Sequence, residues 1–149
     1  MGASSRQNWL TLTSLAGMHD ATLLALRLLT GSFLVHEVWD NIVGATRMQE
    51  FVQFLAQFGF PAPHFLAPLS VWVQFVCGVA LLLGLLTRWA GLLLVANFVV
   101  AVVMVHWAEP FRGWWPAIIL VFLGAHFAAA GSGRFGLDRV IERARSLAR

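Results

Sequence analysis

The sequence predicts an all-α, polytopic membrane protein: an antiparallel bundle of four transmembrane helices with interfacial amphipathic helices. Of its 149 residues, 59% are hydrophobic and only 11% are charged, whereas soluble domains carry about 25% charged residues. From Phe51 to Ala108 the only charged residue is Arg88, and from Gly113 to Gly133 there is none. These stretches exceed the roughly 20 apolar residues that a helix needs to cross about 30 Å of hydrocarbon.

Four membrane spans are expected within one membrane domain that covers residues 1–149, and they lie near residues 21–43, 65–86, 88–107 and 114–131. The tight turn predicted at "GLLTR" makes the second and third spans an antiparallel hairpin, and Thr87 is expected to cap the third span. Pro116 falls in the first turn of the fourth span, where its missing N–H costs little.

Two further segments are expected to lie on the membrane surface. In residues 47–58, apolar side chains recur at i, i+3, i+4 and i+7, namely Phe51, Phe54, Leu55 and Phe58. Polar side chains lie on the opposite face of this helix. In residues 137–148, one face is apolar and the other carries arginines, a pattern typical of a helix attracted to anionic lipid. The alternative for this basic tail is that it only fixes the topology.

Arginine alone predicts the orientation, because the chain contains no lysine. If both termini are cytoplasmic, the inner side holds seven arginines: Arg6, Arg88, Arg134, Arg139, Arg143, Arg145 and Arg149. The outer side then holds only Arg47 and Arg112. The positive-inside rule therefore favours both termini in the cytoplasm. The single Cys77 cannot form an internal disulfide.

Polar side chains from three spans are expected at one level, the outer edge of the membrane. Glu37 lies about 24 Å along the first span, beside His36. The third span runs in the same direction, so His106 and Glu109 reach the same level, and Gln74 lies about a third of the way into the second span. Because ionisable groups in membrane segments tend to line functional sites, these five residues form a candidate polar pocket.

Several candidates also have a simpler interpretation, and for Gln74 it is a hydrogen bond between helices. Arg27, about 9 Å into the first span from the inner side, either faces the bundle with Glu37 or extends its guanidinium to the inner headgroups. Glu37 and Glu109 are also consistent with hydrated boundary residues. His106, next to Trp107, is consistent with an interfacial aromatic pair.

Four segments resemble successive blocks of the DoxX family of small four-helix membrane proteins. They are "RLLTGSFLVHEVWDNI", "FVQFLAQFGFPAPHFLAPLSVWVQFVCGVALLLGLLTRWAGLLLVAN", "VHW" and "GSGRFGLDRVI", with "GLLTR" and "GSGRFGLD" the most distinctive parts. By position, the resemblance points to Arg27, His36, Gln74 and His106. The family commonly has Gly where this chain has Glu37, and Glu where it has Gln74, so a carboxylate has moved from the second helix to the first.

The resemblance implies an accessory redox role in the bacterial cytoplasmic (inner) membrane. Family members are similar to the small membrane subunit of thiosulfate:quinone oxidoreductase, or are associated with oxidative-stress complexes. We therefore expect a subunit that anchors an oxidoreductase partner and binds quinone through six residues: His36, Glu37, Gln74, His106, Glu109 and Arg27. The histidines would donate hydrogen bonds to a quinone carbonyl, Glu37 or Glu109 would exchange protons, and Gln74 would orient the headgroup.

The partner is expected to dock on the arginines of the last helix, where charge steers the encounter. One alternative function is a haem- or metal-binding bundle with His36 and His106 as axial ligands, and another is a transport or assembly factor without redox chemistry. The chain has no flavin or nucleotide fingerprint, CxxC pair or HExxH motif, so a redox group other than quinone or haem would belong to the partner. The lipid bilayer and a second copy of the chain are expected partners, and nucleic acid is not.

Overall fold

The computed structural model describes residues 13–148, and within them every regular element is a helix. In chain order the elements are η1 (Thr13–Met18), α2 (His19–Val43), α3 (Ala45–Gln57), α4 (Pro63–Leu83), α5 (Thr87–Ala101), η2 (Val102–His106), α6 (Phe111–Ala130) and α7 (Leu137–Leu147). The predicted all-α class is therefore confirmed. Arg6 and Arg149, which contributed to the predicted orientation, lie outside the described residues.

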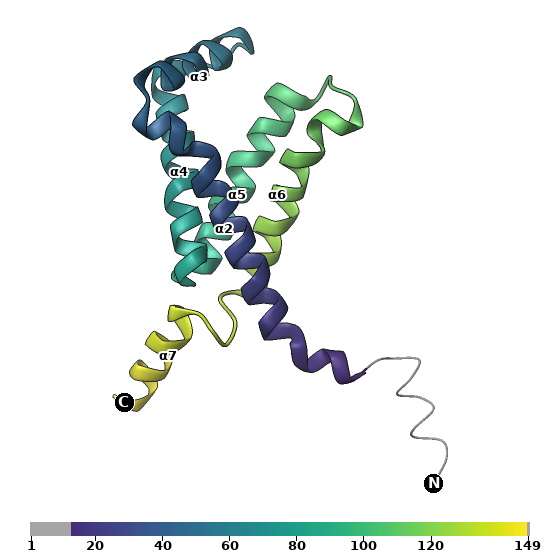
Figure 1. The fold of residues 1–149 in the computed structure, drawn as a ribbon, viewed down its shortest axis with the longest axis vertical. Coiled ribbons are helices and arrows are strands. Elements are labelled where there is room, and N and C mark those ends of the chain that lie inside the picture. Colours follow the sequence, from purple (N-terminus) through teal and green to yellow (C-terminus); the bar gives the residue numbers. More distant parts are fainter. Residues whose placement is uncertain (1–12, 149) are drawn as a thin grey trace.

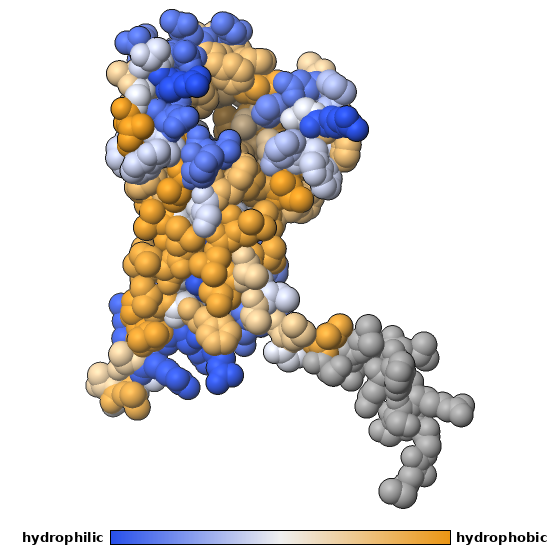
Figure 2. All heavy atoms as spheres, in the orientation of Figure 1, coloured by the Kyte–Doolittle hydropathy of each residue, from blue (hydrophilic) through white to orange (hydrophobic). Residues whose placement is uncertain are grey.

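Four stretches of helix are long and apolar enough to cross a membrane: His19–Val43, Pro63–Leu83, Thr87–His106 and Phe111–Ala130. On the face drawn in Figure 2, an apolar belt crosses the middle of the bundle and separates two polar ends. We call them the α3 end and the α7 end, after the short amphipathic helix at each (Figure 1). The protein is thus a multi-pass membrane protein. Helix α2 begins at the α7 end of the bundle.

The bundle consists of two closely packed helix pairs, and each pair meets at two glycines. A Cβ on Gly31 of α2 would lie 2.7 Å from the carbonyl oxygen of Gly78 in α4. A Cβ on Gly91 of α5 would lie 2.5 Å from the carbonyl oxygen of Gly124 in α6. Only glycine permits such backbone-to-backbone contact, which drives helix association in lipid through close packing.

Buried side chains from all four spanning helices form one core: Leu23, Leu34, Cys77, Leu81, Ala90, Leu94, Phe98, Ala117, Leu120 and Phe127. A second, smaller cluster of Val52, Leu55 and Ala67 fastens α3 to α4. Towards the α3 end, the α5–α6 hairpin diverges from α2 and α4 (Figure 1). The surface in Figure 2 is hollowed between the two lobes there. The fold therefore leaves a recess at the α3 end.

At the α7 end, Arg27 is almost fully buried, with 1% of the residue exposed. Its Nε donates a hydrogen bond to the carbonyl oxygen of Leu81 at 3.0 Å, and its Nη1 donates to the carbonyl oxygen of Ser132. Of the two interpretations of Arg27, the structure supports the one in which it faces the bundle. The side chain ties α2 to the end of α4 and to the loop between α6 and α7.

Asp138, the second residue of α7, completes this connection. Its carboxylate accepts hydrogen bonds from the main-chain N–H groups of Leu86, at 2.7 Å, and Thr87, at 3.0 Å. Its own N–H donates to the carbonyl oxygen of Gly84 at 2.9 Å. The prediction that Thr87 caps its own helix is therefore wrong, because a distant carboxylate satisfies the free N–H groups of α5. We call these contacts of Arg27 and Asp138 the latch.

Candidate functional site

An open, mainly acidic pocket of about 500 Å³ lies at the corner between α2 and α3. Its lining residues are Glu37, Asp40, Asn41, Arg47, Glu50, Phe51 and Phe54. The amide of Asn41 donates to the carbonyl oxygen of Arg47 at 3.2 Å, which fixes the turn between the two helices. The guanidinium of Arg47 pairs with Glu50 at 3.1 Å. Glu37 therefore lies in a polar niche beneath α3.

His36 lies outside this pocket, although it is the neighbour of Glu37 in sequence. Its side chain is 88% exposed, and its Nδ1 lies 3.8 Å from Glu37 Oε1. Successive residues on a helix point about 100° apart, so the imidazole projects away from the buried stripe that contains Leu34 and Val38. The geometry gives His36 no partner on another helix among the described residues.

Gln74 belongs to a short polar chain between α4 and α5. Its Nε2 donates to the hydroxyl of Ser70 at 3.1 Å, and that hydroxyl donates to Asn97 Oδ1 at 2.9 Å. Ser70 is absent from the sequence-based candidates. Its i, i+4 spacing from Gln74 could have identified Ser70 from the sequence, because this spacing places both side chains on one face of α4, the face that meets α5.

His106 and Glu109 form a pair at the tip of the third span. His106 Nδ1 lies 3.0 Å from Glu109 Oε2, and the side chains are 27% and 40% exposed. His106 ends the π-helical segment η2, and the N–H of Glu109 donates to the His106 carbonyl oxygen at 2.9 Å. The Glu109 carboxylate fills the space that a Cβ on Gly113 would need, so this glycine makes room for the pair.

The structure therefore distributes the six predicted site residues over several places. Glu37 lines the α2–α3 pocket, Gln74 belongs to the α4–α5 polar chain, and His106 pairs with Glu109. His36 is exposed, and Arg27 is held in the latch at the opposite end. Within residues 13–148, no hydrogen bond or ion pair joins the Glu37, Gln74 and His106 groups to one another.

These groups lie at different levels along the bundle. His106 is nine residues beyond Asn97, or about 14 Å along the helix, so the polar chain lies deeper in the bundle than the imidazole. In Figure 1 the α2–α3 corner and the tip of η2 stand on opposite sides of the opening. Among the described residues, no group of three or more His, Cys, Asp or Glu side chains is arranged to hold a metal ion.

Four spanning helices and an amphipathic helix at each polar end define a small multi-pass membrane protein. A family model described as DoxX matches residues 22–107, from the first turn of α2 to the end of the third span. The chain therefore belongs to the DoxX family, as the sequence blocks predicted. No curated protein and no solved structure matches the chain.

Proposed function

We propose that this chain is the membrane subunit of a quinone-linked redox complex, with the quinone headgroup in the recess at the α3 end. The observation that carries the proposal is the His106–Glu109 pair. An imidazole whose Nδ1 faces a carboxylate has a defined tautomer and orientation, which leaves Nε2 for a ligand. The pair lies at the edge of the apolar belt, where a membrane-dissolved headgroup meets water.

The pair can exchange protons at one defined atom. While Nδ1–H donates to Glu109, the neutral ring accepts a hydrogen bond at Nε2 from a hydroxyl of a reduced headgroup. Once protonated, the ring donates from Nε2 to a carbonyl of an oxidised headgroup. Glu109 contacts Nδ1 and is partly exposed, so it connects the ring to the aqueous side.

The remaining groups of the recess fit the same ligand. Gln74, Ser70 and Asn97 already form hydrogen bonds with one another, and their remaining donors and acceptors suit the far side of a headgroup. The apolar surfaces of α4 and α5 suit an isoprenoid tail. Arg27 is not part of this proposed site, because its guanidinium is buried in the latch at the other end.

The reaction requires a partner. A quinone takes up two electrons and two protons when it becomes a quinol, and the recess supplies proton carriers. The sequence shows no flavin, nucleotide or CxxC motif, so the electrons would pass through a partner oxidoreductase. The exposed arginines of α7 support docking at that end: Arg139, Arg143 and Arg145.

The same charges support the orientation in a bacterial cytoplasmic membrane. Five arginines line one pocket at the α7 end: Arg88, Arg134, Arg139, Arg143 and Arg145. Arg47 and Arg112 lie at or near the α3 end, in α3 and the first turn of α6. By the positive-inside rule the α7 end faces the cytoplasm.

The proposal is tested by quinone-linked electron transfer in membranes of a strain that lacks the chain. Restoring the wild-type chain should restore the activity, and His106→Gln should lower it about 10²-fold, as expected for a lost general acid–base. His19→Gln, at the opposite end of the bundle, is the matched control and should retain wild-type activity. Undiminished activity in the deletion strain, at equal membrane content, would overturn the proposal.

A further inference from the structure

A second, larger pocket of about 730 Å³ lies at the α7 end. Its walls come from four parts of the chain: the start of α2, the α4–α5 turn with the start of α5, the α6–α7 loop, and α7. The latch holds these parts together, because Arg27 and Asp138 bind the turn and the loop. The main-chain segments that form the pocket are thus fixed by a buried scaffold.

Cationic side chains predominate in this pocket, where five arginines face three carboxylates. Each carboxylate already accepts a hydrogen bond. Asp138 caps α5, Asp20 accepts from the N–H of Arg134 at 3.1 Å, and Glu142 accepts from Arg139 at 3.4 Å. Among the described residues, the guanidinium groups of Arg134 and Arg143 have no hydrogen-bond partner. The pocket therefore has spare N–H donors.

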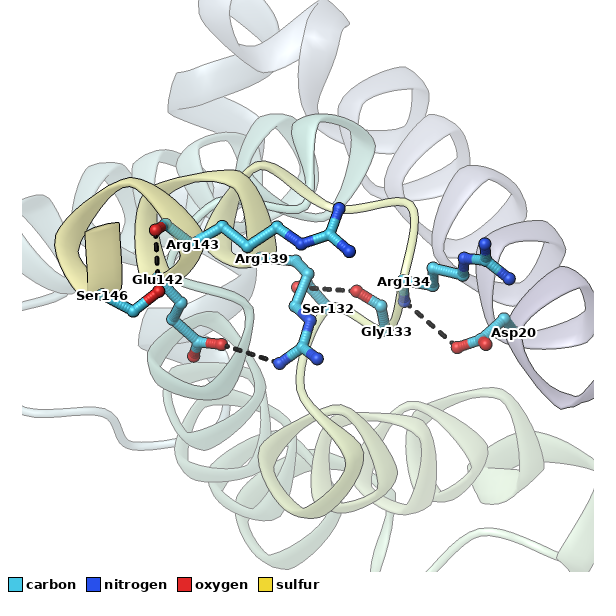
Figure 3. A network of polar contacts seen from close by, with 8 residues as sticks. All are labelled: Asp20, Ser132, Gly133, Arg134, Arg139, Glu142, Arg143 and Ser146. Carbon is cyan, nitrogen blue, oxygen red and sulfur yellow. Dashed lines mark hydrogen bonds and ion pairs between the residues drawn. The ribbon is translucent and has the colours of Figure 1, made fainter.

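The donors approach one space from different elements. Figure 3 shows Arg139 and Arg143 reaching from α7 towards the loop that carries Ser132, Gly133 and Arg134, which Asp20 meets from α2. From α5, Arg88 Nη1 donates to the carbonyl oxygens of Ala128 and Ala129, at 2.8 and 2.6 Å. These two bonds fix the Arg88 guanidinium at the pocket wall, with its remaining N–H groups unused.

One wall of the pocket is apolar and continues into the surface of the bundle. Trp89, Leu86 and Ile141 line it, and Trp89 is 66% exposed. Trp is the side chain that membrane proteins place at the level of the headgroups. In Figure 2 the hydrophilic side chains of the α7 end begin directly below the apolar belt. The pocket thus joins a cluster of arginines to a surface suited to acyl chains.

From this arrangement we infer that the α7-end pocket binds one anionic phospholipid. The phosphodiester lies among Arg134, Arg139 and Arg143, and the acyl chains run along Trp89 and Leu86. Guanidinium groups recognise phosphate through paired N–H donors, and basic pockets between membrane helices suit anionic headgroups. A soluble anion would leave the apolar wall without a function. The inference does not depend on quinone binding at the other end.

The test is native mass spectrometry of the purified full-length chain, released from nanodiscs that contain equal amounts of phosphatidylglycerol and phosphatidylcholine. We expect one retained phosphatidylglycerol per chain. The double variant R134Q/R143Q removes two guanidinium groups that form no hydrogen bond within residues 13–148, so the fold should persist. It should retain phosphatidylglycerol about 30-fold less strongly, from a loss of about fivefold for each arginine at the membrane surface. The matched control is R112Q, at the start of α6.

Three outcomes would overturn the inference. The first is equal retention of phosphatidylglycerol by the wild type and R134Q/R143Q. The second is equal retention of phosphatidylcholine and phosphatidylglycerol by the wild type. The third is displacement of the lipid by millimolar inorganic phosphate, which would assign the arginines to a free anion. If R134Q/R143Q has the same unfolding temperature as the wild type, its loss of lipid is caused by the change in the pocket and not by a loss of the fold.

Discussion

The guanidinium of Arg27, in the first spanning helix, donates a hydrogen bond to the carbonyl oxygen of Ser132, 105 residues further along the chain. A second bond from the same group reaches Leu81 in α4. One buried cation therefore connects α2, α4 and the α6–α7 loop at the α7 end. Because Arg27 lies away from the recess, its role is to hold the bundle together.

Replacing Arg27 should therefore destabilise the protein without directly altering the recess. Arg27→Ala removes the donor of the Ser132 carbonyl oxygen and one of the two donors of the Leu81 carbonyl oxygen, which keeps the N–H of Gly84, and we expect a loss of about 2 to 4 kcal/mol. Arg27→Lys should lose less, although a single ammonium cannot reproduce the two directions of the Nε and Nη1 bonds. Thermal unfolding in detergent measures both variants, with Arg112→Ala as the exposed control. If Arg27→Ala unfolds at the same midpoint temperature as the wild type, the contacts of the latch do not stabilise the bundle.

Asp138 gives a separate prediction, because it caps α5 and anchors α7. Asp138→Ala should cost about 1 to 2 kcal/mol as a lost helix cap and should release α7 from the bundle. Asp138→Asn keeps one capping oxygen and should show a smaller effect. Limited trypsin digestion measures the release as faster cleavage after Arg139 and Arg143. Glu142→Ala, which removes only an exposed ion pair, should be cleaved at the wild-type rate.

The two glycine contacts predict which small residues the bundle requires. Gly91→Ala places a methyl group against the backbone of α6, and we expect a cost of about 1 to 3 kcal/mol from overpacking. Gly31→Ala should cost a similar amount at the α2–α4 contact. Gly17→Ala is the control, because a Cβ there meets nothing within 4 Å. Equal stability of all three variants would show that the helices do not need this close approach.

The His106–Glu109 pair should behave as one unit in catalysis. Glu109→Gln keeps a hydrogen-bonding side chain but removes the charge, so we expect a loss of at least about tenfold in quinone-linked activity. Because the two groups are in contact, the double variant should lose much less than the product of the two single losses. Glu50→Gln, in the α2–α3 pocket wall, tests whether the effect is specific. Multiplicative losses would show that the pair does not act together.

Orientation is measured by cysteine accessibility in intact cells. On a Cys77→Ala background, Ala62→Cys lies between α3 and α4 and should react with a membrane-impermeant maleimide. Ser146→Cys in α7 should react only after the membrane is permeabilised, because we propose a cytoplasmic α7 end. The reverse labelling pattern would place the recess on the cytoplasmic side and overturn the proposed orientation.

Much of the fold follows from local patterns. Hydropathy over about 20 residues locates a membrane span, and α2 begins at His19, two residues before the expected start at residue 21. Small residues in the spans include Gly78 and Gly124, which do form contacts. The same pattern also includes Ala125 and Ala129, which are exposed. Composition identifies small residues, but only the packing of the helices decides which of them meet.

The parts that the sequence did not predict depend on long-range geometry. The cap of α5 comes from Asp138, because the α6–α7 loop returns to the α4–α5 turn, and no local signal at Thr87 reports this. The i, i+3 pairing of His106 with Glu109 depends on how the chain leaves the π-helical segment η2. Counting residues along a helix gives the level of a side chain, whereas its partner depends on the path of the neighbouring chain.

The latch has a mechanical consequence for the whole bundle. Asp138 holds the short turn from Gly84 to Leu86, and this turn joins the α2–α4 pair to the α5–α6 pair. Each pair is held by its own close glycine contact, and this turn is the short connection between the two pairs. Because Asp138 bonds to the main chain of the turn, α7 is attached to the bundle at the point where the two pairs are joined.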